Sequence, residues 1–395
     1  MDTGRSCVLV AALAAVVLFP AERGAADTSL TTIDVNSVKD LVDFDLGDGV
    51  CDADPAPGDA VVTLRAAIQN ANQAGQQVTV NVPAGTYRLT LKGANENESA
   101  TGDLDITGDV RVIGAGAATT IIDAKKAKDR VFDVKPEAIA EIANVTIQNG
   151  RTPKDDSGGG IRNDGTLTAS RCIVAKCKAD DDAGGIDCNG ESGTLQHVVI
   201  RDCKAKDDGG GIDTDGSNMS ILACAFVRNK AGSSGGGMEI SGGTVSLQAC
   251  TFSANKTKED GGAVAVEDGG ILSMDTCTLA KNRARTGGGL SNQSSEVTIV
   301  NDVFWKNRKG NCDGAVESQG GNVSDDESCS PGVDDLSETN ALLAPLADNG
   351  GATLTHALLP GSPAATSGVN CGTGVDGRGV ERPAGTCASG AFQPE

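Results

Sequence analysis

The middle of the chain repeats itself about every 26 residues, and this period limits the possible folds more than any other feature. A Gly-Gly or Gly-Ala step followed by an aliphatic residue recurs at intervals of 25 or 26 residues. The aliphatic positions are Ile161, Ile186, Ile212, Met238, Val264 and Leu290. A fixed period of this length is typical of solenoids and other repeat architectures. The chain is therefore expected to stack similar units along one axis.

Each repeat contains short segments in which apolar and polar residues alternate, separated by Gly-rich turns. The segment with Leu222, Cys224 and Phe226 shows the period of two that is typical of β-strands. No part of the repeat has the helical period, which excludes helical repeats and βαβ units. The pattern predicts an all-β fold, a right-handed parallel β-helix with about 26 residues per coil, because parallel crossovers are right-handed in about 98% of cases.

Both ends of such a helix need a cover, since an open coil exposes core and unpaired strand edges. We expect the β-helix to occupy 87–330, with an N-terminal cap over 27–86 and an irregular C-terminal capping segment over 331–395. The N-terminal cap should contain a short helix at 64–74. Its buried face would consist of Leu64, Ala67, Ile68 and Ala71.

The N-terminus predicts export. After Arg5, residues 7–19 form an uninterrupted apolar run of 13 residues, which Pro20 ends before the small residues at 24–26. This is the pattern of a signal peptide, assigned to 1–26, and the run is too short to cross a bilayer as a helix. An uncleaved anchor or a buried helix is the alternative. We expect a secreted protein, extracellular or at the cell surface, with no membrane span in the mature chain.

Charge and composition limit the partners. The net charge of −21 repels nucleic acid and anionic lipid, so nucleic acid is not an expected partner. The 53 glycines suit a fold with many tight turns, whereas seven Phe, one Tyr and one Trp offer few aromatic platforms for a sugar-binding cleft. The expected partner is an extracellular or surface glycan or protein that the sequence does not identify.

Two columns of polar or small residues recur with the repeat. The first contains Asn149, Asn229, Asn255, Asn282 and Asn307, with Cys177 and Cys203 in two coils. Asparagines stacked at a turn can hydrogen-bond along the column, which favours a structural ladder over a ligand site. The second column contains Cys224, Cys250 and Cys277, which should point inward as small apolar residues.

Twelve of the 13 cysteines follow the signal peptide, an even number in a compartment where disulfides persist. Neighbouring coils lie about 4.8 Å apart, so stacked cysteines of the second column could also pair. The predicted disulfides are Cys312–Cys329, Cys371–Cys387 and Cys177–Cys203.

Acidic and basic residues form ladders beside these columns. Asp182, Asp208 and Asp260 follow the first column by five residues and should stack on one edge. The residue directly after that column is basic: Lys178, Lys204, Lys230, Lys256, Arg283 and Arg308. One interpretation is mutual compensation on a solvated face, where each exposed pair contributes little.

The other interpretation is a calcium site, because Ca²⁺ takes several oxygen ligands in a flexible geometry. The only cluster dense enough for an ion consists of Asp180, Asp181, Asp182, Asp207 and Asp208. No cofactor other than calcium is indicated. A third column, formed by Asp187, Asp213 and Glu239, has no matching cations, so these carboxylates either spread into water or share a cation.

Both ends of the chain resemble known bacterial patterns. Cys51 and the following TLRAAIQNAN resemble the CSLREAI-type N-terminal domain, although Val62 stands where that pattern has Cys and Ala66 where it has Glu. The tail LLAPLADNGGATLTHALLPGSPA, with DGRGVERP and CASGAFQ after it, resembles choice-of-anchor Q proteins, with Gly377 in place of Gln and Gln393 in place of an acidic residue. The resemblance implies an exported β-helical surface or secreted protein and brings no catalytic residues with it.

These features favour a secreted or cell-surface structural or adhesive β-helical protein without an evident catalytic site. The alternative is a polysaccharide lyase or hydrolase acting on extracellular glycans, with calcium as a candidate requirement. A glycosidase needs two carboxyl groups in opposed environments, and the abundance of Asp and Glu makes no pair specific. His197 and His356 are too distant in sequence to suggest a metal cluster or a triad, and His356 is expected to be a hydrogen-bond partner in the cap.

Overall fold

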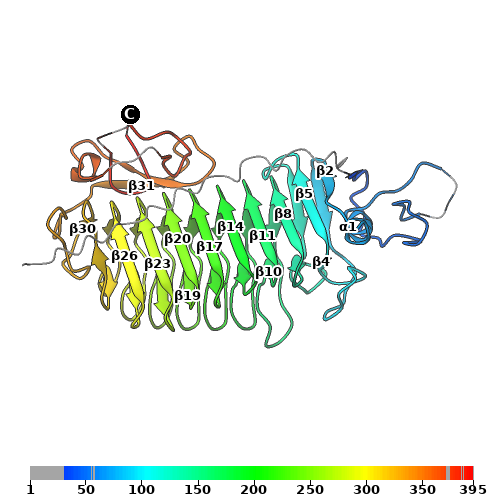
Figure 1. Cartoon of the computed structure of the whole chain (residues 1–395), viewed down its shortest axis with the longest axis horizontal. Helices are drawn as coiled ribbons and strands as arrows, with labels where there is room; N and C mark the ends of the chain where they lie inside the picture. Colours follow the sequence, from blue (N-terminus) through cyan, green and yellow to red (C-terminus); the bar gives the residue numbers. More distant parts are fainter. Residues whose placement is uncertain are drawn as a thin grey trace, which may run out of the picture.

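The computed structural model describes residues 31–394 apart from 55, 57, 371–373, 384 and 386. The predicted signal peptide and Cys371 lie outside the described residues. The described chain winds into a solenoid of three parallel sheets, which confirms the predicted fold class (Figure 1). Each regular coil passes through the sheets named B, A and C in that order. A longer segment, named the C–B turn, then leads to the next coil.

Sheet A is the longest sheet in the described residues. Its strands are β1 (Thr31–Asp34), β2 (Val78–Val82), β5 (Asp109–Gly114), β8 (Ile139–Ala143), β11 (Thr166–Ser170), β14 (Ser192–Gln196), β17 (Asn218–Leu222), β20 (Thr244–Gln248), β23 (Ile271–Asp275), β26 (Glu296–Val300) and β29 (Glu317–Ser318). The pairing of β1 with β2 and of β2 with β5 is already parallel, so the ladder begins before residue 87.

Sheets B and C use mostly three-residue strands. Sheet B contains β4 (Leu104–Ile106), β7 (Phe132–Val134), β10 (Ile161–Asn163), β13 (Ile186–Cys188), β16 (Ile212–Thr214), β19 (Met238–Ser241), β22 (Val264–Glu267), β25 (Leu290–Asn292) and β28 (Cys312–Asp313). Sheet C contains β3 (Gly85–Arg88), β6 (Thr120–Asp123), β9 (Thr146–Gln148), β12 (Ile173–Ala175), β15 (Val199–Arg201), β18 (Ala225–Val227), β21 (Thr251–Ser253), β24 (Thr278–Ala280), β27 (Val303–Trp305) and β30 (Val323–Ser324).

The core is a set of columns that run along the axis. The six repeated aliphatic residues, from Ile161 to Leu290, pair in register on sheet B and are fully buried. On sheet C, the rings of Phe226 and Phe252 stack with centroids 4.3 Å apart. A single coil has no second layer to cover its apolar side chains, so the burial depends on stacking with its neighbours.

The asparagine ladder is present, with one correction. Asn255 Nδ2 donates to the carbonyl oxygen of Phe226 at 2.9 Å, and Asn229 N donates to Asn255 Oδ1 at 2.9 Å. Asn149 is not a member, and that assignment was wrong. It occupies the corner position before the column, where its φ of 61° matches that of Lys176 at 58°. The coil that follows Asn149 is longer than the regular repeat and shifts the register.

The second column, formed by Cys224, Cys250 and Cys277, is buried as expected. In the first column, the predicted disulfide between Cys177 and Cys203 is wrong. Both thiols are free and buried. Cys177 Sγ donates to the carbonyl oxygen of Ala175 at 3.4 Å, and Cys203 Sγ donates to that of Arg201 at 3.5 Å. In stacked positions of parallel coils the two Cα–Cβ vectors run side by side, so a short Cα distance alone does not give disulfide geometry.

The predicted N-terminal helix is α1 (Leu64–Gln73), which packs at the start of the solenoid against β2, β4 and β5 (Figure 1). Thr63 caps it by accepting a hydrogen bond from Ala66 N, and the predicted apolar face is buried. Arg65 on this helix is fully buried as well. Its guanidinium donates to the carbonyl oxygens of Ser99, Gly102 and Asp103. This one side chain therefore fixes the loop at residues 99–103.

The C-terminal segment lies mainly against the outer face of sheet C rather than over the end of the solenoid (Figure 1). Its antiparallel hairpin consists of β31 (Leu343–Ala347) and β32 (Thr355–Leu358), followed by the 3₁₀ helix η1 (Pro363–Ala365). Leu346 and Leu354 pack against a small apolar cluster of Val199, Ala225 and Val227. These outward apolar residues on sheet C explain why the segment covers the flank.

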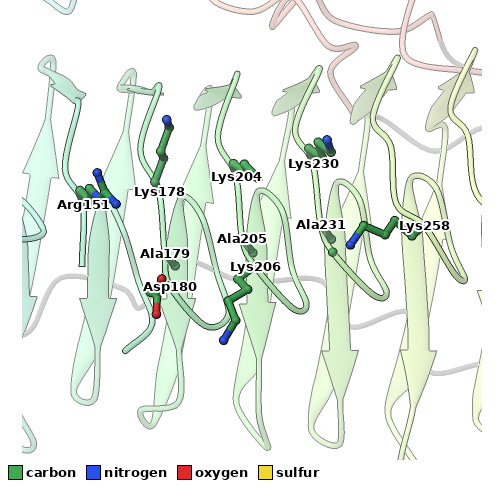
Figure 2. A pocket seen from close by; sticks show the side chains of 11 residues that line it. Arg151, Lys178, Ala179, Asp180, Lys204, Ala205, Lys206, Lys230, Ala231 and Lys258 are labelled. Atoms are coloured by element: carbon green, nitrogen blue, oxygen red, sulfur yellow. The ribbon is translucent and has the colours of Figure 1, made fainter. Parts of the chain in front are cut away.

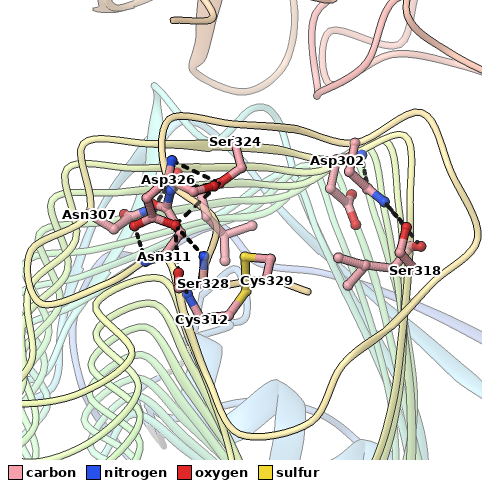
Figure 3. The surroundings of a disulfide bond; sticks show 12 residues. Asp302, Asn307, Asn311, Cys312, Ser318, Ser324, Asp326, Ser328 and Cys329 are labelled. Atoms are coloured by element: carbon pink, nitrogen blue, oxygen red, sulfur yellow. Dashed lines mark hydrogen bonds between the residues drawn. A yellow bond between two sulfur atoms is a disulfide. The ribbon is translucent and has the colours of Figure 1, made fainter. Parts of the chain in front are cut away.

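The last coil contains the confirmed disulfide Cys312–Cys329 (Figure 3). Beside it, Cys312 N donates to Ser328 Oγ, and Ser328 Oγ donates to Asp326. Cys387 is disulfide-bonded, but its predicted partner Cys371 is outside the described residues, so that pairing stays a prediction. None of the helices in the described ranges is long and apolar enough to cross a bilayer.

Candidate functional site

The C–B turns build a basic row with one member per coil. Within each regular turn, a left-handed residue is followed by the buried Asn or Cys, then by an exposed Lys or Arg. The row pairs through parallel bridges in the order Arg151, Lys178, Lys204, Lys230, Lys256, Arg283 and Arg308. The sequence predicted six of these residues and missed Arg151, because the longer coil places it two residues after Asn149.

The first four members of the basic row, from Arg151 to Lys230, form one wall of a trough (Figure 2). The floor consists of Ala179, Ala205 and Ala231, all buried. The other wall carries Asp180, Lys206, Gly232 and Lys258 in successive coils. The trough holds about 360 Å³. The alternation Lys204-Ala205-Lys206 shows how the sequence makes it, since an extended segment points alternate side chains outward and the alanine inward.

The basic row is not neutralised by the acidic ladder. Among the described residues, no ion pair joins Lys178, Lys204 or Lys230 to a carboxylate. On the opposite wall, Lys206 Nζ lies 3.8 Å from Asp207 Oδ2, and both side chains are about half exposed. The expected mutual compensation is therefore weak, and the trough keeps a local positive charge.

The acidic ladder instead bonds to backbone. Asp182 Oδ1 accepts from Asp208 N at 2.7 Å, and Asp208 Oδ1 accepts from Ser234 N at 2.5 Å. Asp260, two coils further along the column, differs: it accepts from the side-chain hydroxyl of Thr286 at 2.5 Å and pairs with Arg285 at 3.5 Å. Each carboxylate thus ties one C–B turn to the turn of the next coil.

The residues of the predicted calcium site lie in two adjacent C–B turns. Asp180 Oδ2 accepts from the backbone of the preceding turn, at Asp155 N. Burial, followed by the neighbouring carboxylates, raises the pKa of Asp181 and Asp182, and burial also raises that of Asp208. The cluster is crowded with negative charge, and calcium binding there stays a prediction.

The third acidic column points outward from sheet B but is covered by the C–B turns. Asp187, Asp213 and Glu239 keep 2%, 8% and 5% of their surface, so they do not spread into water. Burial raises the pKa of all three carboxyl groups, and Glu239 shares a hydrogen bond with Asp213. Each of these buried carboxyl groups therefore favours its protonated form more than an exposed carboxyl group does. Asp213 Oδ1 has no hydrogen-bond partner.

The covering turns leave no room above this column. A Cβ atom added to Gly209 would lie 2.5 Å from Asp213 Cβ, and one added to Gly235 would lie 2.6 Å from Glu239 Cβ. Neither carboxyl group lines the trough. Buried carboxyl groups with raised pKa values also occur at catalytic sites. These three acids, however, keep at most 8% of their surface and do not line the trough.

The sequence also missed a buried ion network near the N-terminal end. Arg130 pairs with Asp133 at 2.8 Å and with Asp103 at 3.5 Å, while Lys135 pairs with Asp105 at 2.8 Å. Carboxylate oxygens of Glu96, Asp103 and Asp105 lie within 4.8 Å of one another, a spacing that could hold a metal ion. These residues lie in irregular coils, where no repeat reveals which side chains meet.

The two histidines have different surroundings. His356 is buried in the hairpin, where Nε2 lies 3.0 Å from Ser253 Oγ and Nδ1 lies 2.8 Å from the carbonyl oxygen of Ala344. This contact fastens the C-terminal segment to sheet C, as expected of a hydrogen-bond partner in the cap. Burial lowers the pKa of His356 and of the half-buried His197.

A match to a family model supports the fold. Residues 131–323 match the family described as right handed beta helix region, which agrees with the predicted hand. No curated protein matches the chain significantly. Among solved structures, ORF18 of Geobacillus virus E2 is similar at 13% sequence identity with a TM-score of 0.32, covering 64% of this chain and 58% of that one. The match thus spans little more than half of the viral protein.

Proposed function

We propose that this protein is a non-catalytic β-helical binding scaffold that works outside the cell or at its surface. The right-handed β-helix serves surface proteins and also glycan-acting enzymes, so the fold alone does not choose between them. The choice rests on the trough, an exposed hollow of about 360 Å³. Its walls carry basic side chains and one carboxylate, Asp180.

This composition suits binding better than hydrolysis. A glycosidase needs two carboxyl groups on either side of the scissile bond, one protonated and one ionised. The hydrogen-bonded acid pair Asp213 and Glu239, whose pKa values burial raises, lies under the C–B turns and outside the trough. The pKa values of Asp181, Asp182 and Asp208 are raised as well, and these three acids do not line the trough either. The observation that carries the proposal is this separation of the exposed hollow from the acid pair.

A polysaccharide lyase is the second candidate, because cations beside a hollow could neutralise a uronate while a base removes a proton. The test incubates the chain with a panel of neutral and acidic polysaccharides, with and without calcium. The assay measures new reducing ends for hydrolysis and new unsaturated uronates for elimination. The proposal expects neither product above the level of a heat-unfolded control. Turnover that is lost in Lys204→Gln would replace the scaffold with a lyase.

A further inference from the structure

The basic trough has the features of a site for a linear acidic polymer. We propose that it binds a polyuronate, a glycan with one carboxylate per sugar, laid along the solenoid axis across successive coils. This inference rests on the proposed binding function and adds the class of ligand. It is argued from the charge, the spacing and the shape of the trough.

The charge of the trough is local. The whole chain carries −21, yet the trough gathers Arg151, Lys178, Lys204 and Lys230 on one wall with no ion pair to any of the three lysines. At physiological salt the screening length is about 8 Å, so carboxylates far from the trough hardly affect a ligand inside it. Asp180 on the second wall and Asp207 beside Lys206 lie close enough to reduce the attraction, and neither pairs with the lysines of the basic row. A polymer with regularly spaced negative charges would be attracted there, while the remaining surface would repel it.

The spacing of the basic row favours one charge per sugar. The row advances by one coil at each step, or about 4.8 Å. This is close to the length of one sugar unit in an extended glycan. Because consecutive members pair in register, the charges lie on a straight line, and each further sugar can meet a further cation. Sulfated glycans carry denser and less regular charge, which fits a single straight row less well.

On the second wall of the trough, lysines recur at every second coil. Lys206 and Lys258 stand on this wall in alternate coils (Figure 2). In the coil between them, the same position is Gly232. A side chain at Gly232 would collide with the carbonyl oxygen of Lys206, so the gap is built into the backbone. In a two-fold glycan ribbon, successive carboxylates point to opposite edges. Such a ribbon could place alternate carboxylates against Lys206 and Lys258 and the others against the basic row.

The same features disfavour nucleic acid. Sites for single strands normally stack bases on aromatic side chains, and no aromatic residue lines the trough. Phosphates of a duplex advance by about 3.4 Å per strand, which does not match the coil spacing. The small side chains of Ala179, Ala205 and Ala231 form the floor, so no bulky group there blocks a single extended chain.

The test compares binding by the full chain and by two charge-matched variants. The trough variant carries Lys178→Glu, Lys204→Glu and Lys230→Glu. The control variant carries Lys39→Glu, Lys92→Glu and Arg171→Glu, which are exposed residues outside the trough. Each triple changes the net charge by the same −6, because every substitution replaces +1 by −1. Equal melting temperatures would show that both variants fold.

The probe is a polyuronate oligomer of about ten sugars, titrated by calorimetry at low and physiological salt. We expect the trough variant to lose at least about tenfold in affinity and the control to lose no more than about twofold, with wild-type binding that weakens as salt rises. Equal losses of affinity in both variants, or wild-type affinity that does not change with salt concentration, would overturn the assignment. Tighter binding of dextran sulfate or single-stranded DNA of equal length would also overturn it.

The two proposals fail in different ways. If the polyuronate is bound and then cut, the non-catalytic function fails while the ligand class stands. If it is neither bound nor cut, the ligand class fails and the scaffold function stands. The amounts of bound and cleaved oligomer are measured in the same samples.

Discussion

At the residue scale, Asn255 shows how much of the stability depends on single buried amides. Its Oδ1 accepts from Asn229 N, while its Nδ2 donates to the carbonyl oxygen of Phe226 and to Asn282 Oδ1. The side chain is fully buried, so no water can replace these bonds. The amide thus links three consecutive coils by hydrogen bonds.

Replacing Asn255 with Ala should leave the Asn229 N–H and the Phe226 carbonyl unpaired inside the protein. Each orphaned group costs about 1–3 kcal/mol, so the free energy of unfolding should fall by several kcal/mol. Denaturant unfolding measures this loss. The control is Asn218→Ala on the exposed face of β17, which should change the unfolding free energy by less than about 0.5 kcal/mol. Equal effects of the two changes would contradict the ladder.

Glu239 and Asp213 should make stability depend on pH. Burial raises both pKa values, and Asp208 and Glu267 add negative charge nearby. The folded pair therefore keeps a proton that the unfolded chain releases near pH 4. The native state binds more protons above that pH, so stability should fall as the pH rises from about 4 toward and through the folded pKa values.

The variant Glu239→Gln removes one of the two charges and keeps a group that can donate to Asp213. Its melting temperature should fall less between pH 5 and pH 8 than that of the wild type. Thermal melts over this range give the difference in slope. The matched control is Glu317→Gln, an exposed carboxylate whose loss should leave the slope unchanged. If the melting temperature of Glu239→Gln changed with pH as steeply as that of the wild type, the pair would not titrate as described.

At the element scale, the C–B turn combines three functions in about ten residues. It supplies the buried Asn or Cys, the exposed cation and the acid that bonds to the next turn, as in the segment from Cys203 to Asp208. A calcium ion between neighbouring turns would reinforce the same edge. The five acids from Asp180 to Asp208 remain the sequence-based candidate for it.

If that cluster binds calcium, millimolar Ca²⁺ should raise the melting temperature more than NaCl of matched ionic strength. At about 100-fold excess over the dissociation constant the gain is about 2.7 kcal/mol. Changing Asp182 and Asp208 to Asn keeps the Oδ1 acceptors of the ladder and removes the charge, so the calcium-specific shift should vanish. The control replaces the exposed Asp313 and Asp334 with Asn. A shift that survives in the cluster variant would place the ion elsewhere.

The 26-residue period predicted the columns of side chains well, because parallel coils stack residues that are one repeat apart. The inward column from Ile161 to Leu290 and most of the basic row followed directly from the spacing. The prediction failed where a coil departs from the period, as at Asn149. It also failed to show that the third acidic column lies beneath the turns, because periodicity gives the side on which Asp213 stands but not what covers it.

At the scale of the whole molecule, the solenoid turns a repeated sequence into a straight array of side chains. The trough follows the axis over several coils because the same positions of successive C–B turns line it. The C-terminal hairpin covers part of sheet C (Figure 1). Its residues do not line the trough at the C–B turns. The sequence could not predict this placement, because the contact between His356 and Ser253 joins residues 103 positions apart.

The central claim is that an acidic glycan lies in the trough, and lysine footprinting tests it most directly. The chain is treated briefly with an amine-acetylating reagent, with and without a polyuronate oligomer, and acetylation is measured at each lysine by mass spectrometry. The account predicts protection of Lys178, Lys204, Lys206, Lys230 and Lys258, while Lys39 and Lys92 react as in the free protein. Uniform protection of all lysines, or protection that spares the trough, would contradict it.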